Sequence, residues 1–321
     1  MKTKISSITL IIIGFLTIQA QTCCSGGIPL SNNLGLPSSE KGTFLIGLNY
    51  DYNNLNTLNR GTDNLNDDSR LRITHSALLS LGYSITERLS FETLLTWINQ
   101  RRKISQFENE NLDQTTGMGD AVLLIKYNFP KFLGSNSVSD LGIGTKIPLG
   151  SSTETNDSGI IYNADLQPGS NAWDLIFYSL FVKSFDFDPL INFYSRIFYR
   201  NTGRNSEYQG DLSYKYGNEF QVFLGANKQF LISKMLVSPG LSFKYRKVEN
   251  DEINGFEIAN TGGLWVFIIP DLTLNLNPNL SFISRAELPI LSNVEGTQLT
   301  PTYRVTFGFL IRFIQKQKLM I

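Results

Sequence analysis

Residues 303–313 alternate strictly, with one face that is apolar and aromatic throughout. Val305, Phe307 and Phe309 lie on that face, whereas Arg304 and Arg312 lie on the other. Successive side chains of a β-strand point to opposite faces, so this segment is predicted to be a strand with one apolar face and one charged face. The pattern recurs along nearly the whole chain. It predicts a transmembrane β-barrel that is apolar towards lipid and polar towards a lumen.

Twelve segments have strand character, and most of them are long enough to cross an apolar layer when tilted, for which about 9–11 residues suffice. Strands of soluble proteins are usually nearer about 5–6 residues. The fold class expected is therefore all-β: one antiparallel transmembrane barrel of about 12 strands, with 10 or 14 as alternatives. The predicted strands are 42–52, 71–84, 89–99, 118–129, 138–149, 172–183, 190–200, 214–227, 235–246, 262–269, 279–288 and 303–313.

The connections between these segments alternate between long polar loops and short turns, as in outer-membrane barrels with long external loops and short periplasmic turns. Both termini are therefore expected in the periplasm. The long loops predicted are 53–70, 100–117, 150–171, 201–213, 247–261 and 289–302. The short turns predicted are 85–88, 130–137, 184–189, 228–234 and 270–278.

Residues 1–20 have the charged start and short apolar core of a secretory signal peptide, which predicts cleavage after Ala20. Removal of Lys2 and Lys4 lowers the formal net charge from 0 to −2, so nucleic acid is not an expected partner. The organisation predicted is a signal peptide at 1–20, a periplasmic segment or plug at 21–40, an outer-membrane barrel at 41–313 and a tail at 314–321.

Charged side chains within the predicted strands fall opposite the more apolar face. A Lys or Arg that faces lipid at mid-depth costs about 2–4 kcal/mol, whereas one that faces a wet lumen costs little. In the sixth strand, Ile176, Leu180 and Val182 share the lumen phase with Asp174, which indicates a partly apolar lumen, contact with a plug, or a bulge. The predicted lumen-lining residues are Asp120, Lys126, Lys146, Asp174, Arg196, Glu219, Lys244, Arg285, Glu287, Arg304 and Arg312.

Cys23 and Cys24 are the only cysteines, and they follow the predicted cleavage site directly. They suit a disulfide in the oxidising periplasm, or two of the ligands of a soft metal ion, but no third cysteine completes such a site. Residues 25–37 mix Gly, Pro and Asn with spaced Leu and Ile. Their two interpretations are a flexible leader and a short plug that enters the lumen. No metal site and no cofactor are predicted.

His75 is the only histidine, and it lies on the lipid-facing phase of the second strand, where an interfacial position is expected. Catalytic triads of the Ser-His-Asp or Cys-His type would have to use it. No carboxylate pair with a base stands out, so the chain is not expected to be an enzyme.

Four strings carry a resemblance to a known family: GMGDAVLLIKY at 117–127, GIGTKIPLG at 142–150, DLQPGSNAWD at 165–174 and LPILSNVEGTQLT at 288–300. In this order and spacing, the chain resembles the outer-membrane transporters grouped with the meta-pathway of phenol degradation, which are distantly like the long-chain fatty acid transporter family. The resemblance covers roughly residues 40–313. It implies an outer-membrane barrel that passes small, often apolar molecules.

The function predicted is a channel or transporter for a small apolar or amphipathic solute. The alternatives are a non-transporting barrel that acts through its external loops, a membrane-embedded hydrolase, and a soluble secreted β-sandwich. The partners expected are outer-membrane lipid, a small-molecule solute and the barrel assembly machinery; the sequence does not indicate an oligomeric state.

Overall fold

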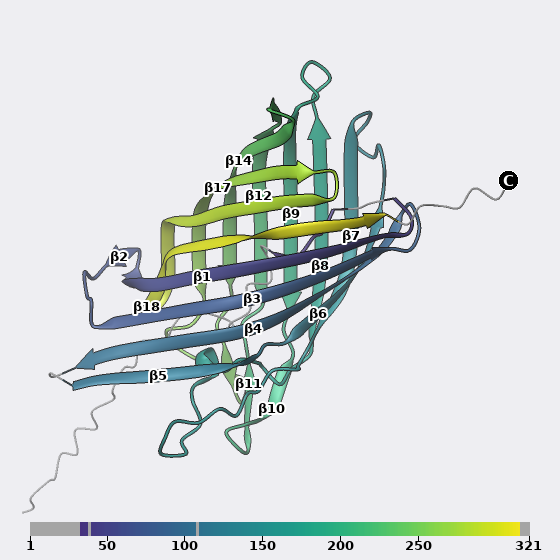
Figure 1. The fold of residues 1–321 in the computed structure, drawn as a ribbon. Helices are drawn as coiled ribbons and strands as arrows, with labels where there is room; N and C mark the ends of the chain where they lie inside the picture. The colour runs from purple at the N-terminus through teal and green to yellow at the C-terminus, as the bar shows by residue number, and fades with distance from the viewer. Residues whose placement is uncertain (1–32, 38–39, 107–108, 315–321) are drawn as a thin grey trace, which may run out of the picture.

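The computed structural model describes residues 33–37, 40–106 and 109–314, and these form a closed antiparallel β-barrel (Figure 1). Its wall follows the order β12-β9-β8-β7-β6-β4-β3-β1-β18-β17-β14, and pairing of β12 with β14 closes the circuit of eleven elements. The wall strands are β1 (Thr43–Gly61), β3 (Arg70–Ser84), β4 (Leu89–Gln106), β6 (Ala121–Asn128), β7 (Ser137–Ile147), β8 (Asp174–Ser184), β9 (Ile191–Asn201), β12 (Glu219–Lys228), β14 (Met235–Val248), β17 (Gly263–Asn277) and β18 (Leu280–Ile314).

Element β18 is 35 residues long and pairs with two neighbouring strands. Its first part pairs with β17, from Leu280 to Val294, and its last part pairs with β1, from Val294 to Ile314. The predicted strands 279–288 and 303–313 thus both fall within β18. The prediction of a long loop at 289–302 is wrong, because the pairing continues through these polar residues. Gly296 has a φ of +71°, a backbone conformation that glycine adopts without steric cost.

The predicted turn at 270–278 is also wrong. Proline lacks an N–H group and usually marks a strand end or an edge, which is why the sequence suggested a break at Pro270. In the structure the pairing of β17 with β14 holds on both sides of this proline, with Ile269 opposite Ser242 and Asp271 opposite Gly240. Element β17 runs on to Asn277, and the turn to β18 is short.

The external end of the barrel, taken as the end with the long connections, carries additional strands. Strand β4 continues into a hairpin with β5 (Asn109–Met118), so the predicted loop 100–117 is mostly strand. The predicted loop 53–70 is partly strand too, because β1 extends to Gly61 and pairs with β2 (Asp63–Asn64). A separate small sheet joins β10 (Arg204–Tyr208), β11 (Leu212–Lys215), β15 (Glu252–Ile253) and β16 (Phe256–Glu257). At the opposite end, β13 (Phe230–Ile232) pairs with β14.

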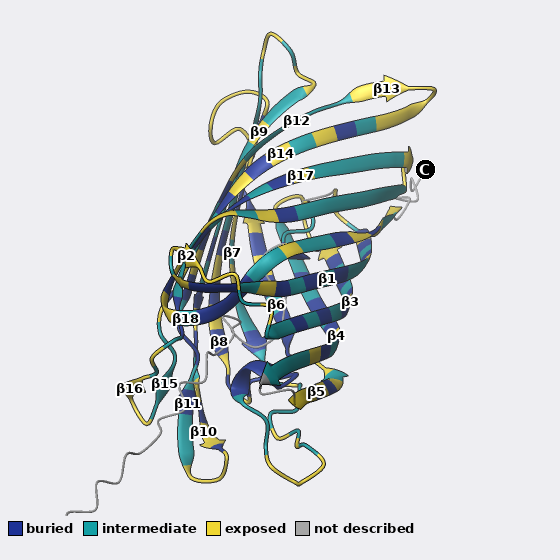
Figure 2. Ribbon diagram, turned by 90° about the vertical axis from the view of Figure 1, so that its left-hand side faces the viewer, coloured by how far each residue is buried: buried dark blue, intermediate teal, exposed yellow. Residues whose placement is uncertain are grey.

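Buried and exposed positions alternate along the wall strands (Figure 2). In β3 the even-numbered side chains face inward, and in β1 the odd-numbered ones do. The outward positions carry large apolar side chains such as Leu48, Ile125 and Phe309, which are about half exposed. This apolar outer surface suits a lipid environment, and the polar inner surface suits a lumen. Among the described residues, no helix is long and apolar enough to cross a membrane.

Candidate functional site

Residues 33–37, called the lumenal segment below, lie inside the barrel. Leu34 is only 2% exposed and belongs to a buried cluster with Leu78, Leu94, Val122, Ile176 and Phe198, which come from five wall strands. Strand β8 pairs with β7 and β9 without any register shift, so the bulge considered for the Ile176 region is excluded. Ile176 faces inward in the regular register of β8, and its side chain packs in the same buried cluster as Leu34.

The backbone of the lumenal segment is held by a charged pair of the wall. The Glu92 carboxylate accepts hydrogen bonds from the N–H groups of Gly35 at 3.0 Å and Leu36 at 3.0 Å. Lys126 forms an ion pair with Glu92 at 2.9 Å and also donates to the Leu36 carbonyl. Arg196 donates to the Leu34 carbonyl at 3.4 Å. These contacts satisfy backbone groups that would otherwise be costly to bury.

A line of alternating charges near the external end of the barrel runs from Asp120, just before β6, across the five neighbouring strands β7, β8, β9, β12 and β14. We call it the charge ladder: Asp120, Lys146, Asp174, Arg200, Glu219 and Arg246. Its contacts are Lys146 to Asp120 at 2.9 Å and to Asp174 at 3.2 Å, Arg200 to Asp174 at 3.8 Å and to Glu219 at 3.1 Å, and Arg246 to Glu219 at 2.6 Å. Every member has a neighbour of opposite sign, which offsets the cost of removing these charges from bulk water.

Two further ion pairs lie inside the barrel on the side formed by β14, β18 and β1. Lys244 pairs with Glu287, and both side chains are buried. Arg304 donates to the Asp51 carboxylate at 2.9 Å. Arg312, near the end of β18, is only half-buried. The predicted lumen residues therefore fall into separate groups of paired charges.

The long connection between β7 and β8 folds into the external mouth. Its short 3₁₀ turn, Ala164–Leu166, is buried. Arg72 forms an ion pair with Asp165 at 3.4 Å and donates to its carbonyl, and the Thr115 hydroxyl donates to the Leu166 carbonyl at 2.6 Å. The wall strands thus hold this connection across the opening.

The small sheet of the external connections packs against the same turn. Tyr208, Tyr214 and Tyr216 form a buried cluster with Ala164, and the Tyr216 hydroxyl donates to the Ala164 carbonyl at 2.7 Å. We call this cluster and the 3₁₀ turn the external cap. Asp251 accepts from the Tyr214 hydroxyl at 2.5 Å and from the Gly217 N–H at 2.7 Å. Burial raises the pKa of the Asp251 carboxyl above its ordinary value, mainly by penalising the charged form.

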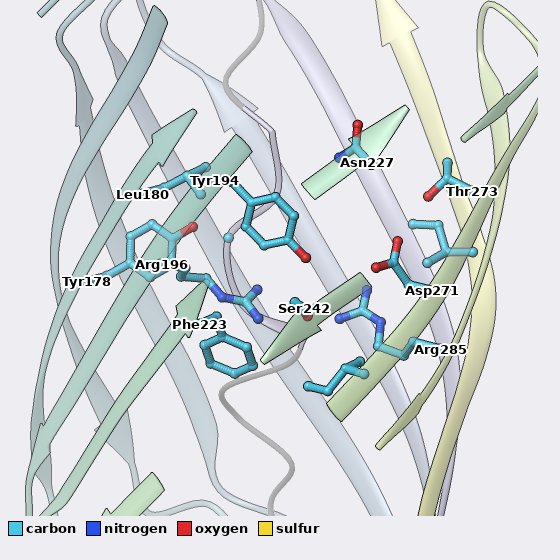
Figure 3. A pocket seen from close by; sticks show the side chains of 13 residues that line it. Tyr178, Leu180, Tyr194, Arg196, Phe223, Asn227, Ser242, Asp271, Thr273 and Arg285 are labelled. Carbon is cyan, nitrogen blue, oxygen red and sulfur yellow. The ribbon is translucent and has the colours of Figure 1, made fainter. Parts of the chain in front are cut away.

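A cavity of about 230 Å³ lies inside the barrel next to the lumenal segment (Figure 3). Gly35 forms part of its wall, and Arg196 and Arg285 lie on its sides with Tyr194 and Asp271. A second cavity of about 100 Å³ shares Gly35, Arg196 and Arg285 and is bounded by the whole lumenal segment. Displacement of this segment would therefore join the two spaces.

His75 lies in an aromatic group on the outer face. The Tyr50 hydroxyl is 2.5 Å from His75 Nδ1, and the Tyr52 ring packs edge-on against the imidazole. Among the residues that the structure describes, no three His, Cys, Asp or Glu side chains gather in a way that suits a metal ion. Cys23, Cys24 and the predicted signal peptide lie outside the described residues.

Several residues of the interior were not predicted. Arg200 and Arg246 share the inward phase of Arg196 and Lys244 and end the predicted strands 190–200 and 235–246, so the same alternation was enough to find them. Arg72 likewise lies on the inward phase of β3. Asp165 has no signal in the sequence, because it belongs to an irregular connection that becomes buried only in the folded barrel.

Comparisons with known proteins support the fold. No family model matches the chain, and no curated protein matches it. Among solved structures, an outer membrane channel from Pseudomonas putida F1 is similar with a TM-score of 0.66 at 14% identity, over 89% of this chain and 100% of that chain. The protein is an outer-membrane β-barrel. Its apolar outer face and this shared fold both place it in the outer membrane.

Two further solved structures are more distant. The beta domain of the Bordetella autotransporter BrkA has a TM-score of 0.45 at 10% identity, over 83% of this chain and 99% of that chain. The CymD monoaromatic hydrocarbon channel has a TM-score of 0.43 at 9% identity, over 86% of this chain and 90% of that chain. The resemblance to the transporters grouped with phenol degradation stays a prediction from the sequence.

Proposed function

We propose that the protein is an outer-membrane channel that passes a small apolar or amphipathic solute, with the lumenal segment as its gate. The observation that carries this proposal is the internal cavity, which is bounded on one side by the lumenal segment and not by the wall alone. A barrel with a purely structural role needs no such space. We further propose twelve membrane-spanning segments, in which the two parts of β18 count separately.

The way the lumenal segment is bound supports a gating role. Its contacts with the wall include the packing of Leu34 and hydrogen bonds with the side chains of Glu92, Lys126, Arg196 and Asn49, so side chains hold it and not a strand ladder. Regions that must move in a protein are drawn from its less stable parts. Release of five residues would leave the wall strands paired as before.

The lining of the cavity supports the choice of solute. Leu180, Phe223 and Ile269 provide apolar surface, whereas Tyr194, Arg196 and Arg285 provide polar groups. Ligand pockets are commonly apolar with a few placed polar groups that orient the ligand. A solute that has both an apolar body and one polar group fits this mixture better than a sugar or an inorganic ion.

Uptake into liposomes that contain the purified, folded barrel tests the proposal. We expect small aromatic alcohols to enter these liposomes faster than protein-free liposomes, and disaccharides to enter no faster. Heat-modifiable migration in detergent would establish that the barrel is folded. A folded barrel that accelerates no solute and shows no conductance would contradict the proposal, and would favour a barrel that acts through its external loops.

A further inference from the structure

The cavity beside the lumenal segment has an excess of positive charge. Its charged lining residues are Arg196, Arg285 and Asp271, so two guanidinium groups face one carboxylate. The guanidinium groups of Arg196 and Arg285 point toward each other across the space (Figure 3). Other cations of the interior, such as Lys244 and Arg200, have acidic partners elsewhere and do not line this cavity.

Arg196 is held in an orientation that suits an anion. Its guanidinium carbon lies 4.0 Å from the centroid of the Phe223 ring, which supports the flat face of the group. Its Nη1 donates to the Leu34 carbonyl at 3.4 Å, and its buried Nε has no hydrogen-bond partner. Because a guanidinium presents several N–H donors in one plane, a group fixed in this way still offers donors to a carboxylate.

Arg285 faces Arg196 from β18, and its cross-strand neighbour on β17 is Asp271. Figure 3 shows the Asp271 carboxylate beside the Arg285 guanidinium, at the edge of the same space. Asp271 therefore offsets the charge of one arginine but not of both. One further negative charge between the two arginines would make the cavity neutral.

The remaining walls define the body that such an anion would have. Tyr178 and Tyr194 provide aromatic side chains, and Leu180, Ile269 and Ile283 provide aliphatic surface. The volume of about 230 Å³ is below the range of about 300–1,000 Å³ that holds drug-sized ligands. It suits a single ring and not a long acyl chain.

We infer that Arg196 and Arg285 form a binding site for a small organic monoanion, namely a carboxylate on an apolar body of about the size of benzoate. This inference rests on the proposed channel function, since it names the class of solute that would pause in the lumen. The carboxylate lies between the two guanidinium groups, and the ring packs against Tyr178 and Tyr194. The lumenal segment closes the site from one side.

Calorimetric titration of the folded barrel in detergent with sodium benzoate tests the site without requiring transport. Charge-assisted hydrogen bonds are worth about 1.5–3 kcal/mol, so Arg285→Gln and Arg196→Gln should each weaken benzoate binding at least about tenfold. Arg312→Gln is the matched control, because it removes the same charge from β18 outside the cavity. Benzyl alcohol and acetate, which lack the charge and the ring respectively, should both bind more weakly than benzoate.

Asp271→Asn provides a test with the opposite sign. Removal of the competing carboxylate should strengthen benzoate binding, which a variant that only damages the fold would not do. Absence of benzoate binding to the unaltered barrel, equal binding by Arg285→Gln, or equal binding of benzyl alcohol would each overturn the inference. Uptake of neutral solutes without benzoate binding would contradict the proposed anion site but not the proposed channel function. Benzoate binding without uptake of any solute would contradict the channel function but not the anion site.

Discussion

Leu34→Ala tests whether the lumenal segment is a gate. Leu34 is 2% exposed and packs against five side chains of the wall, and it is the segment's contribution to that apolar cluster. Truncation of a buried leucine to alanine costs about 2–5 kcal/mol. Because the cost falls on docking of the segment and not on pairing of the wall strands, even the lower figure raises the undocked population about 30-fold.

Conductance in planar bilayers measures this change. We expect Leu34→Ala to show more frequent or longer open events than the unaltered protein, with heat-modifiable migration unchanged. Leu48→Ala is the matched control, since Leu48 is 49% exposed on the outer face of β1 and should leave conductance as it was. Unaltered conductance in a folded Leu34→Ala barrel would refute the reasoning that this side chain keeps the segment docked.

Three further predictions follow from the wall and the cap. Ile125→Arg on the lipid face should lower barrel stability by about 2–4 kcal/mol in a urea titration in lipid, and stability equal to the unaltered barrel would contradict the assigned register. Lys244→Met should cost about 3–5 kcal/mol because Glu287 is left charged and buried, whereas Lys244→Met combined with Glu287→Leu should recover most of it; no recovery would contradict the pairing. Because the pKa of Asp251 is raised, the contribution of this carboxyl to the stability of the external cap is complete below its ordinary pKa of 3.8 and is lost as pH rises through the raised pKa. Loop proteolysis should therefore rise more over that interval in the unaltered protein than in Asp251→Asn, and an equal rise in both would contradict this role.

Much of the barrel wall follows from the sequence because lipid imposes a strict period of two. Each predicted strand overlaps a wall element, and charges such as Lys126 and Lys146 can be assigned to the inward phase because an arginine or lysine in lipid is costly. The same argument fails where strands leave the membrane. Residues 100–117 carry mostly polar side chains on both faces, so the β4–β5 hairpin shows no apolar alternation and the sequence predicts a loop there.

The interior could be predicted only in part. The alternation along a strand shows which side chains point into the barrel. It does not show which of them contact each other across the lumen, because that depends on the stagger of the strands and on what fills the lumen. The contacts of Glu92 with the lumenal segment and of Arg72 with Asp165 join residues far apart in the sequence. The apolar inward side chains at Ile176 and Leu78 were a usable signal, because apolar residues on a lumen face require something apolar to cover them.

The most direct test of the account compares solute uptake by the full-length barrel with uptake by a variant that lacks residues 23–37, both reconstituted in liposomes at equal amounts of folded protein. The account predicts that the full-length barrel passes a small aromatic alcohol, and that the deletion variant assembles normally and passes it faster. A deletion variant that folds but takes up solute no faster than the full-length barrel would contradict a lumen gated by this segment.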